Sequence, residues 1–205
     1  MLEHYPCTYG VEVGVGSLGT PSKLFQLLVL SMLMGARIRA SVALEAAQAL
    51  FDHKWTRADR MAAVSWEERA SVLNDADYAR FDERTSTMLG EAARMLQDKY
   101  GGDLRRLRDK ASREPSAERR LLKELKGVGD VSVDIFFREA QAAWDEIYPF
   151  ADQKALDAAR RLGLGADVGS LWCLAGTSPS WSPRWSALTS TMHIRTSKEK
   201  PLRYL

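Results

Sequence analysis

The chain has 205 residues, 45% of them hydrophobic and 27% charged, which is ordinary for a soluble globular protein and enough for one or two small domains. The formal net charge of +2 decides nothing about partners, so nucleic-acid binding can be inferred only from where the basic residues lie. Cys7 and Cys173 stand far apart without a CxxC neighbour, which excludes a disulfide framework and a zinc site of the usual spacing.

The three histidines, His4, His53 and His193, are isolated from one another, so a histidine-rich metal site is not expected. No basic start followed by an apolar stretch marks the N-terminus. The longest apolar run, residues 27–34, is too short for a membrane span and contains Ser31. We therefore expect a cytoplasmic protein that binds neither a metal ion nor a membrane.

Helical periodicity dominates the chain, and only residues 11–13 (VEV) hint at a strand. Pro21 precedes a strongly apolar stretch from Leu24 to Leu33, which predicts a helix buried on most sides. Ser65, with two glutamates close behind it, predicts a helix N-cap. The further helices expected in chain order cover residues 42–51 and 81–100, a short basic stretch from 103, and residues 115–125, 130–144 and 153–162.

Two other patterns have a functional and a structural interpretation. Residues 14–19 match GxGxxG after the possible strand, but a dinucleotide fold needs an acid about 20 residues further on, where Arg37 and Arg39 stand. We therefore expect an ordinary flexible loop there. Trp181 and Trp185 could stack on bases, but packing of a C-terminal segment onto the core is the favoured interpretation.

A glycine hairpin lies near the middle of the chain, where residues 125–129 read LKGVG between two amphipathic helices. Glycine-exposed amides and a helix N-terminus bind anions without base contacts. Between residues 101 and 126, nine Lys or Arg face five Asp or Glu, a surplus of four positive charges, which suits sequence-independent phosphate contact. The alternatives are that the glycines merely separate two helices and that the basic residues form a solvated face.

From residue 121 to 164, the order of LKGVG, VDIFFREAQ and PFAD resembles the helix-hairpin-helix DNA glycosylases of the endonuclease III type. The likeness extends upstream through KYGGDL, YARFDERTSTML and the apolar segment that begins at residue 20, and so covers residues 20–165. It implies an all-α protein of two lobes. Residues 21–145 would form a six-helix lobe ending in the hairpin, and residues 1–20 with 146–205 would form a second helical lobe.

The resemblance also implies a chemistry. These enzymes bind double-stranded DNA between the lobes and flip out a damaged base, because the glycosidic bond cannot be reached in the stack. Asp152 matches the catalytic aspartate, which would stabilise positive charge at the sugar C1′ and orient or deprotonate the nucleophile; its alternative role is a helix N-cap. The residues expected to contact DNA are Leu125, Lys126, Gly127, Val128 and Gly129 of the hairpin, together with Lys123 and Lys154.

Four positions depart from the family's pattern, and one of them is Asp130, directly after the hairpin. Val131 occupies the place where bifunctional members carry the lysine that forms a Schiff base, so strand cleavage by this route is not expected. Cys173 is alone where many members carry four cysteines, and this ligand count excludes an iron–sulfur cluster. Leu33 lies in the helix that carries a gap-filling glutamine in endonuclease III-like enzymes; it would either wedge into the base stack or belong to the core.

Two carboxylates near the hairpin have a structural interpretation. Asp130 would repel phosphate but suits the N-terminus of a helix. Asp134 is expected to form a surface salt bridge with Arg138, four residues further on.

The sequence therefore predicts a monomeric glycosylase of DNA base excision repair, which hydrolyses the N-glycosidic bond, has no AP-lyase activity and uses no cofactor. Two alternatives stay open. One is a catalytically silent DNA-binding protein of the same fold, and the other is a helical protein-interaction module without a nucleic-acid role.

Overall fold

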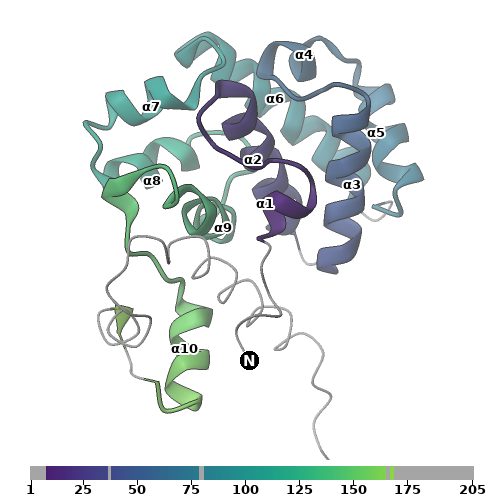
Figure 1. The fold of residues 1–205 in the computed structure, drawn as a ribbon. Helices are drawn as coiled ribbons and strands as arrows, with labels where there is room; N and C mark the ends of the chain where they lie inside the picture. Colours follow the sequence, from purple (N-terminus) through teal and green to yellow (C-terminus); the bar gives the residue numbers. More distant parts are fainter. Residues whose placement is uncertain (1–7, 37, 79–80, 165–166, 169–205) are drawn as a thin grey trace, which may run out of the picture.

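The computed structural model describes residues 8–36, 38–78, 81–164 and 167–168, and every regular element in these ranges is helical. The expectation of an all-α protein is thereby confirmed. Figure 1 shows the helices α1 (Tyr9–Glu12), α2 (Pro21–Met34), α3 (Ala40–Asp52), α4 (Ala58–Ala63), α5 (Trp66–Asp75), α6 (Asp82–Tyr100), α7 (Leu104–Lys110), α8 (Pro115–Lys123), α9 (Asp130–Ala140) and α10 (Gln153–Arg161), with the 3-10 helix η1 (Asp145–Ile147) between α9 and α10.

Local capping chemistry sets the helix starts that the sequence predicts. The Thr20 side chain accepts a hydrogen bond from the Lys23 amide at 3.3 Å, so α2 begins at Pro21 as expected. Ser65 and Glu68 form a reciprocal capping box at α5, which confirms the predicted N-cap. At the N-terminal end of the described chain the strand expectation is wrong, because Val11 belongs to α1.

Helix α2 runs through the middle of the main body and contacts α3 and α9 (Figure 1). All of its residues from Leu24 to Leu33 are buried, as its apolar composition predicts. Leu33 itself is 0% exposed, and its carbonyl accepts a hydrogen bond from the Tyr78 hydroxyl at 2.9 Å. The intercalating role considered for Leu33 is therefore wrong, and the alternative core assignment holds.

The described residues form two separate apolar clusters. The large one spans α1 to η1 and includes Tyr9, Val13, Val15 and Leu18. The described part of segment 1–20 therefore packs against the main body, whereas we expected this segment to belong to the second lobe. In the described residues, segment 21–145 holds eight α-helices, α2 to α9, rather than six. The small cluster consists of alanines on α10 and just before it, and Figure 1 shows α10 standing apart from the main body.

Candidate functional site

The predicted hairpin joins α8 to α9 and is anchored by its two apolar residues. The Leu125 amide donates to the Leu122 carbonyl at 3.0 Å, and the Val128 amide donates to the Leu125 carbonyl at 3.1 Å. The side chains of Leu125 and Val128 are buried in the main core. Of the five hairpin residues expected to contact DNA, these two therefore hold the turn in place, while Lys126 and Gly129 are exposed and Gly127 is half-buried.

Gly127 is required by both backbone conformation and packing. Its φ of +83° lies in the left-handed region, which costs an L-residue about 1–2 kcal/mol. A Cβ at this position would stand 2.8 Å from the Cβ of Met88 and 2.9 Å from its Sδ. The turn thus brings the backbone against α6 at a point where only glycine fits.

Gly129 serves a different purpose, because it is the N-cap of α9 and lies in open space. Its φ of −100° is accessible to any residue, and no heavy atom lies within 4 Å of where a Cβ would stand. Among the residues that the structure describes, none accepts a hydrogen bond from the amides of Gly127 or Gly129. The exposed start of an 11-residue helix with free amides is a geometry that suits an anion.

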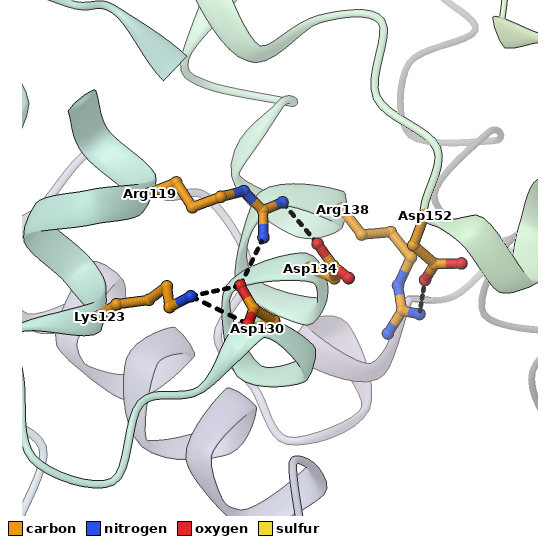
Figure 2. A network of polar contacts seen from close by, with 6 residues as sticks. All are labelled: Arg119, Lys123, Asp130, Asp134, Arg138 and Asp152. Atoms are coloured by element: carbon orange, nitrogen blue, oxygen red, sulfur yellow. Dashed lines mark hydrogen bonds and ion pairs between the residues drawn. The ribbon is translucent and has the colours of Figure 1, made fainter. Parts of the chain in front are cut away.

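The basic residues beside the hairpin are engaged in ion pairs (Figure 2). Lys123 of α8 donates to both carboxylate oxygens of Asp130, at 2.8 and 2.9 Å. Arg119 donates to Asp134 at 2.5 Å and lies 3.7 Å from Asp130. The hydrogen bond from Lys123 holds the pKa of the Asp130 carboxyl below its usual value. Lys123, expected to contact DNA, is therefore already paired with a carboxylate of its own chain.

The expected salt bridge between Asp134 and Arg138 is wrong. Asp134 pairs with Arg119 across the α8–α9 contact, whereas the Arg138 side chain turns inward and is 0% exposed. The other two lysines expected to contact DNA, Lys126 and Lys154, are exposed; the Nζ of Lys126 lies 3.9 Å from a carboxylate oxygen of Glu91.

Asp152 is the N-cap of α10, and its carboxylate is contacted at both oxygens. Oδ1 accepts a hydrogen bond from the Ala155 amide at 2.8 Å, and Oδ2 lies 3.5 Å from Nη1 of Arg138 (Figure 2). The side chain of Asp152 is 8% exposed. The structural role considered for this residue is thereby confirmed, and it leaves the catalytic role open since a capping carboxylate still carries its charge.

The loop before Asp152 is fixed to α9 by Gln141 and an aromatic pair. The Phe150 amide donates to Oε1 of Gln141 at 2.9 Å, and Nε2 of Gln141 donates to the Phe150 carbonyl at 3.2 Å. The rings of Phe137 and Phe150 meet edge to face with 5.6 Å between centroids. Because Phe150 is held at its backbone and its ring, Asp152 two residues later has a defined place beside α9.

Arg138 connects Asp152 to the first residues of the described chain. Its guanidinium lies over the ring of Tyr9 at 5.6 Å from the centroid, and burial raises the pKa of Tyr9 to about 12. The neighbouring Glu139 is also buried, and this burial raises its pKa. No sequence motif predicts that Arg138, Tyr9 and Asp152 come together, because helical spacing alone offers Arg138 an exposed partner in Asp134.

A second group of buried charges lies where the main body leads into α10. Arg108 makes two contacts of 2.5 Å with the carboxylate of Glu146 in η1. Glu118 of α8 is fully buried next to this pair. Burial and the neighbouring Glu146 carboxylate raise the pKa of Glu118 to about 8, while the hydrogen bond from Arg108 lowers the pKa of Glu146 to about 2. We therefore expect the Glu118 carboxyl to carry its proton in the folded protein at neutral pH.

A cavity of about 860 Å³ opens beside the hairpin, between the end of α2 and the start of α6. Val131, at the position of the family's lysine, contributes to its wall and is 46% exposed. Asp152 is not among the lining residues; it contacts α9 at Arg138, seven residues or about 10 Å of helix beyond Val131. The lining consists of Met32, Gly35, Ala36, Phe81, Arg84, Thr85, Met88, Gly127, Gly129, Asp130, Val131 and Ser132.

Comparisons with models of protein families, with curated proteins and with solved structures found no match. In the described ranges, no group of three or more His, Cys, Asp or Glu side chains has the arrangement of a metal site. None of the helices in those ranges has the length and apolarity needed to cross a bilayer. Cys7, Cys173, Trp181 and Trp185 lie outside the described residues.

Proposed function

We propose that this chain binds double-stranded DNA through the hairpin and hydrolyses the N-glycosidic bond of a damaged base, as a monomeric glycosylase of the helix-hairpin-helix type. The observation that carries the proposal is the pair of glycine amides at residues 127 and 129, which find no acceptor among the described residues. Gly129 is the exposed N-cap of α9, where the helix dipole favours an anion, and Gly127 lies two residues before it. A DNA phosphate is an anion that such a turn holds without reading sequence.

The proposal extends to the two-lobed architecture of the resembling family, without an iron–sulfur cluster, and to Asp152 as the catalytic carboxylate. In support, α10 has its own small apolar cluster, and Asp152 stands at the start of this helix against α9. A carboxylate held in this way would stabilise the positive charge that develops at C1′ and orient the attacking water. The buried guanidinium of Arg138 beside it supplies the counter-charge that a carboxylate needs away from water.

Base loss without strand cleavage is part of the proposal. Lyase chemistry in the family requires an amine that attacks C1′, and the corresponding position here is Val131. Lys123, the lysine of α8, is bound to Asp130, and the Nζ of Lys126 in the hairpin lies 3.9 Å from a carboxylate oxygen of Glu91. Neither side chain is therefore positioned as a free nucleophile.

A second candidate is a catalytically silent DNA-binding protein of the same fold. The observation that favours it is the double engagement of Asp152, whose oxygens contact the Ala155 amide and Arg138. A carboxylate that neutralises a buried arginine offers less negative charge to a developing cation. In this candidate, Asp152 serves the fold alone.

The experiment that separates the two uses a panel of duplexes, each with one lesion, scored separately for base loss and for strand nicking. The glycosylase releases one of the bases without nicking, and the Asp152→Asn variant loses release but keeps its affinity for DNA. Asparagine retains the helix cap, and a circular dichroism spectrum at the assay temperature verifies that the variant is folded. Base release by Asp152→Asn at the wild-type rate would refute the catalytic assignment, and a panel without release would favour the silent protein.

A further inference from the structure

Two cations of α8, Lys123 and Arg119, are held by the carboxylate that directly follows the hairpin. Asp130 follows Gly129 directly and is the first residue of α9. Its oxygens accept two hydrogen bonds from Lys123, and one of them lies 3.7 Å from Arg119. The Asp130 side chain is 66% exposed, and Figure 2 shows it together with Lys123 and Arg119.

A DNA phosphate and the Asp130 carboxylate require the same surroundings. Both are anions that gain from lysine, arginine and the positive end of a helix dipole. A phosphate that reaches the Gly129 amide approaches the neighbouring residue, Asp130, and meets like charge there. Binding must then either displace Asp130 from Lys123 and Arg119 or leave these two cations unused.

We propose that Asp130 is an affinity-determining residue that competes, as an internal anion, with a DNA phosphate for Lys123 and Arg119. This inference rests on the DNA-binding part of the proposed function and is independent of base hydrolysis. Its consequence is weak binding to undamaged duplex. The protein should therefore dissociate readily from undamaged DNA, where only the hairpin contacts the duplex, although the hairpin region is basic.

The salt dependence of binding measures this competition. Each phosphate neutralised by a cation contributes a slope of about −0.9 to the plot of log K against log salt concentration. Replacing Asp130 by Asn frees Lys123, so the slope should become steeper by about 0.9. Extrapolated from 1 M to 50 mM salt, that change corresponds to roughly 15-fold tighter binding. Folding should be little affected, because exposed ion pairs contribute about 0–1 kcal/mol.

Glu124→Gln is the matched control. Glu124 lies three residues before Gly127, is exposed, and pairs with Lys99 of α6 at 3.0 Å rather than with Lys123 or Arg119. The Glu124→Gln substitution changes the net charge by the same amount as Asp130→Asn, at a position close in sequence. A second variant, Asp130→Asn combined with Lys123→Gln, removes the cation that the first substitution frees, and should return the slope towards the wild-type value.

The experiment is a fluorescence anisotropy titration of a labelled undamaged duplex at several salt concentrations, with the melting temperature of each variant measured alongside. The expected result is a steeper slope and tighter binding for Asp130→Asn, a smaller effect for Glu124→Gln, and loss of the gain in the double variant. Equal gains for Asp130→Asn and Glu124→Gln, or no gain, would overturn the inference. Absence of binding by every variant at low salt would overturn it together with DNA binding itself, whereas failure of base release alone would leave it standing.

Discussion

Replacing Gly127 by alanine should destabilise the protein far more than the same change at Gly129. At residue 127 the backbone has φ +83°, and the new Cβ would lie 2.8 Å from the Met88 Cβ. The left-handed conformation costs about 1–2 kcal/mol, and overpacking of this kind costs about 1–3 kcal/mol. The free energy of unfolding should therefore fall by about 2–5 kcal/mol. At Gly129 the φ is ordinary and the space is empty, so the loss should stay below about 1 kcal/mol.

Urea denaturation of both variants measures the difference, and a double-mutant cycle tests its cause. Met88→Ala in the Gly127→Ala background removes the Sδ and Cγ of Met88, which would lie 2.9 and 3.0 Å from the new Cβ, but keeps the Met88 Cβ. It should therefore recover only part of the steric cost, which gives a coupling energy of about 0.5 kcal/mol or more. Similar losses at the two glycines, or a cycle without coupling, would refute the assignment of Gly127 to a strained and tightly packed turn.

The same pair of variants separates folding from binding. A methyl group at residue 129 would stand where a phosphate approaches the amide, so Gly129→Ala should lose DNA affinity while remaining folded. The loss of one backbone contact to a charged group amounts to about 1.5–3 kcal/mol, which is tenfold or more in the dissociation constant. Unchanged affinity would show that the Gly129 amide does not contact DNA.

Three further predictions concern buried groups. Glu118 holds its proton up to about pH 8 in the folded state but releases it near its ordinary pKa of 4.5 when unfolded, so the free energy of unfolding of the wild type should decline as pH rises between these values. Glu118→Gln should abolish that decline in denaturation series at pH 5, 6.5 and 8; the same dependence of stability on pH in both proteins would contradict this expectation. Asp152→Asn and Asp152→Ala both remove the carboxylate that lies 3.5 Å from the buried Arg138 guanidinium, at a cost of about 3 kcal/mol. Only alanine also loses the helix cap, so its free energy of unfolding should be lower by a further 1 kcal/mol or so; equal stability of the two variants would contradict the capping role. Gly35→Ala should lower the free energy of unfolding by about 1–3 kcal/mol, because the new Cβ would collide with the Ser132 hydroxyl oxygen. Adding Ser132→Ala to this variant should restore part of the lost stability; no restoration would contradict the close approach of α2 and α9.

The helices could be predicted from sequence because the signals that define them are local. Pro21 after a threonine cap, the capping box at Ser65 and the glycine that ends α6 act within one helical turn. The same locality explains the failure at residues 11–13. Three residues of alternating character fit a strand or a helix equally well, and the cap from Thr8 decides for α1.

Residues of the candidate site could be predicted only where one residue type has both a backbone role and a chemical role. Gly127 could be identified because a glycine between two amphipathic helices is typical of a tight turn, and Asp152 because one residue type both caps α10 and carries a charge. The partners of the charged residues were not predictable. Whether Arg138 faces Asp134 or turns inward depends on Asp152 and Tyr9, which contact its guanidinium and come from distant parts of the chain.

Amide chemical shifts, followed while a short duplex is titrated into a nitrogen-15 labelled sample, show whether the hairpin amides hold DNA. We expect the largest shifts at the amides of residues 127 and 129–131, and we expect these shifts to fade as salt is added. Shifts confined to other parts of the chain, with the hairpin amides unchanged at saturation, would refute the proposed binding site.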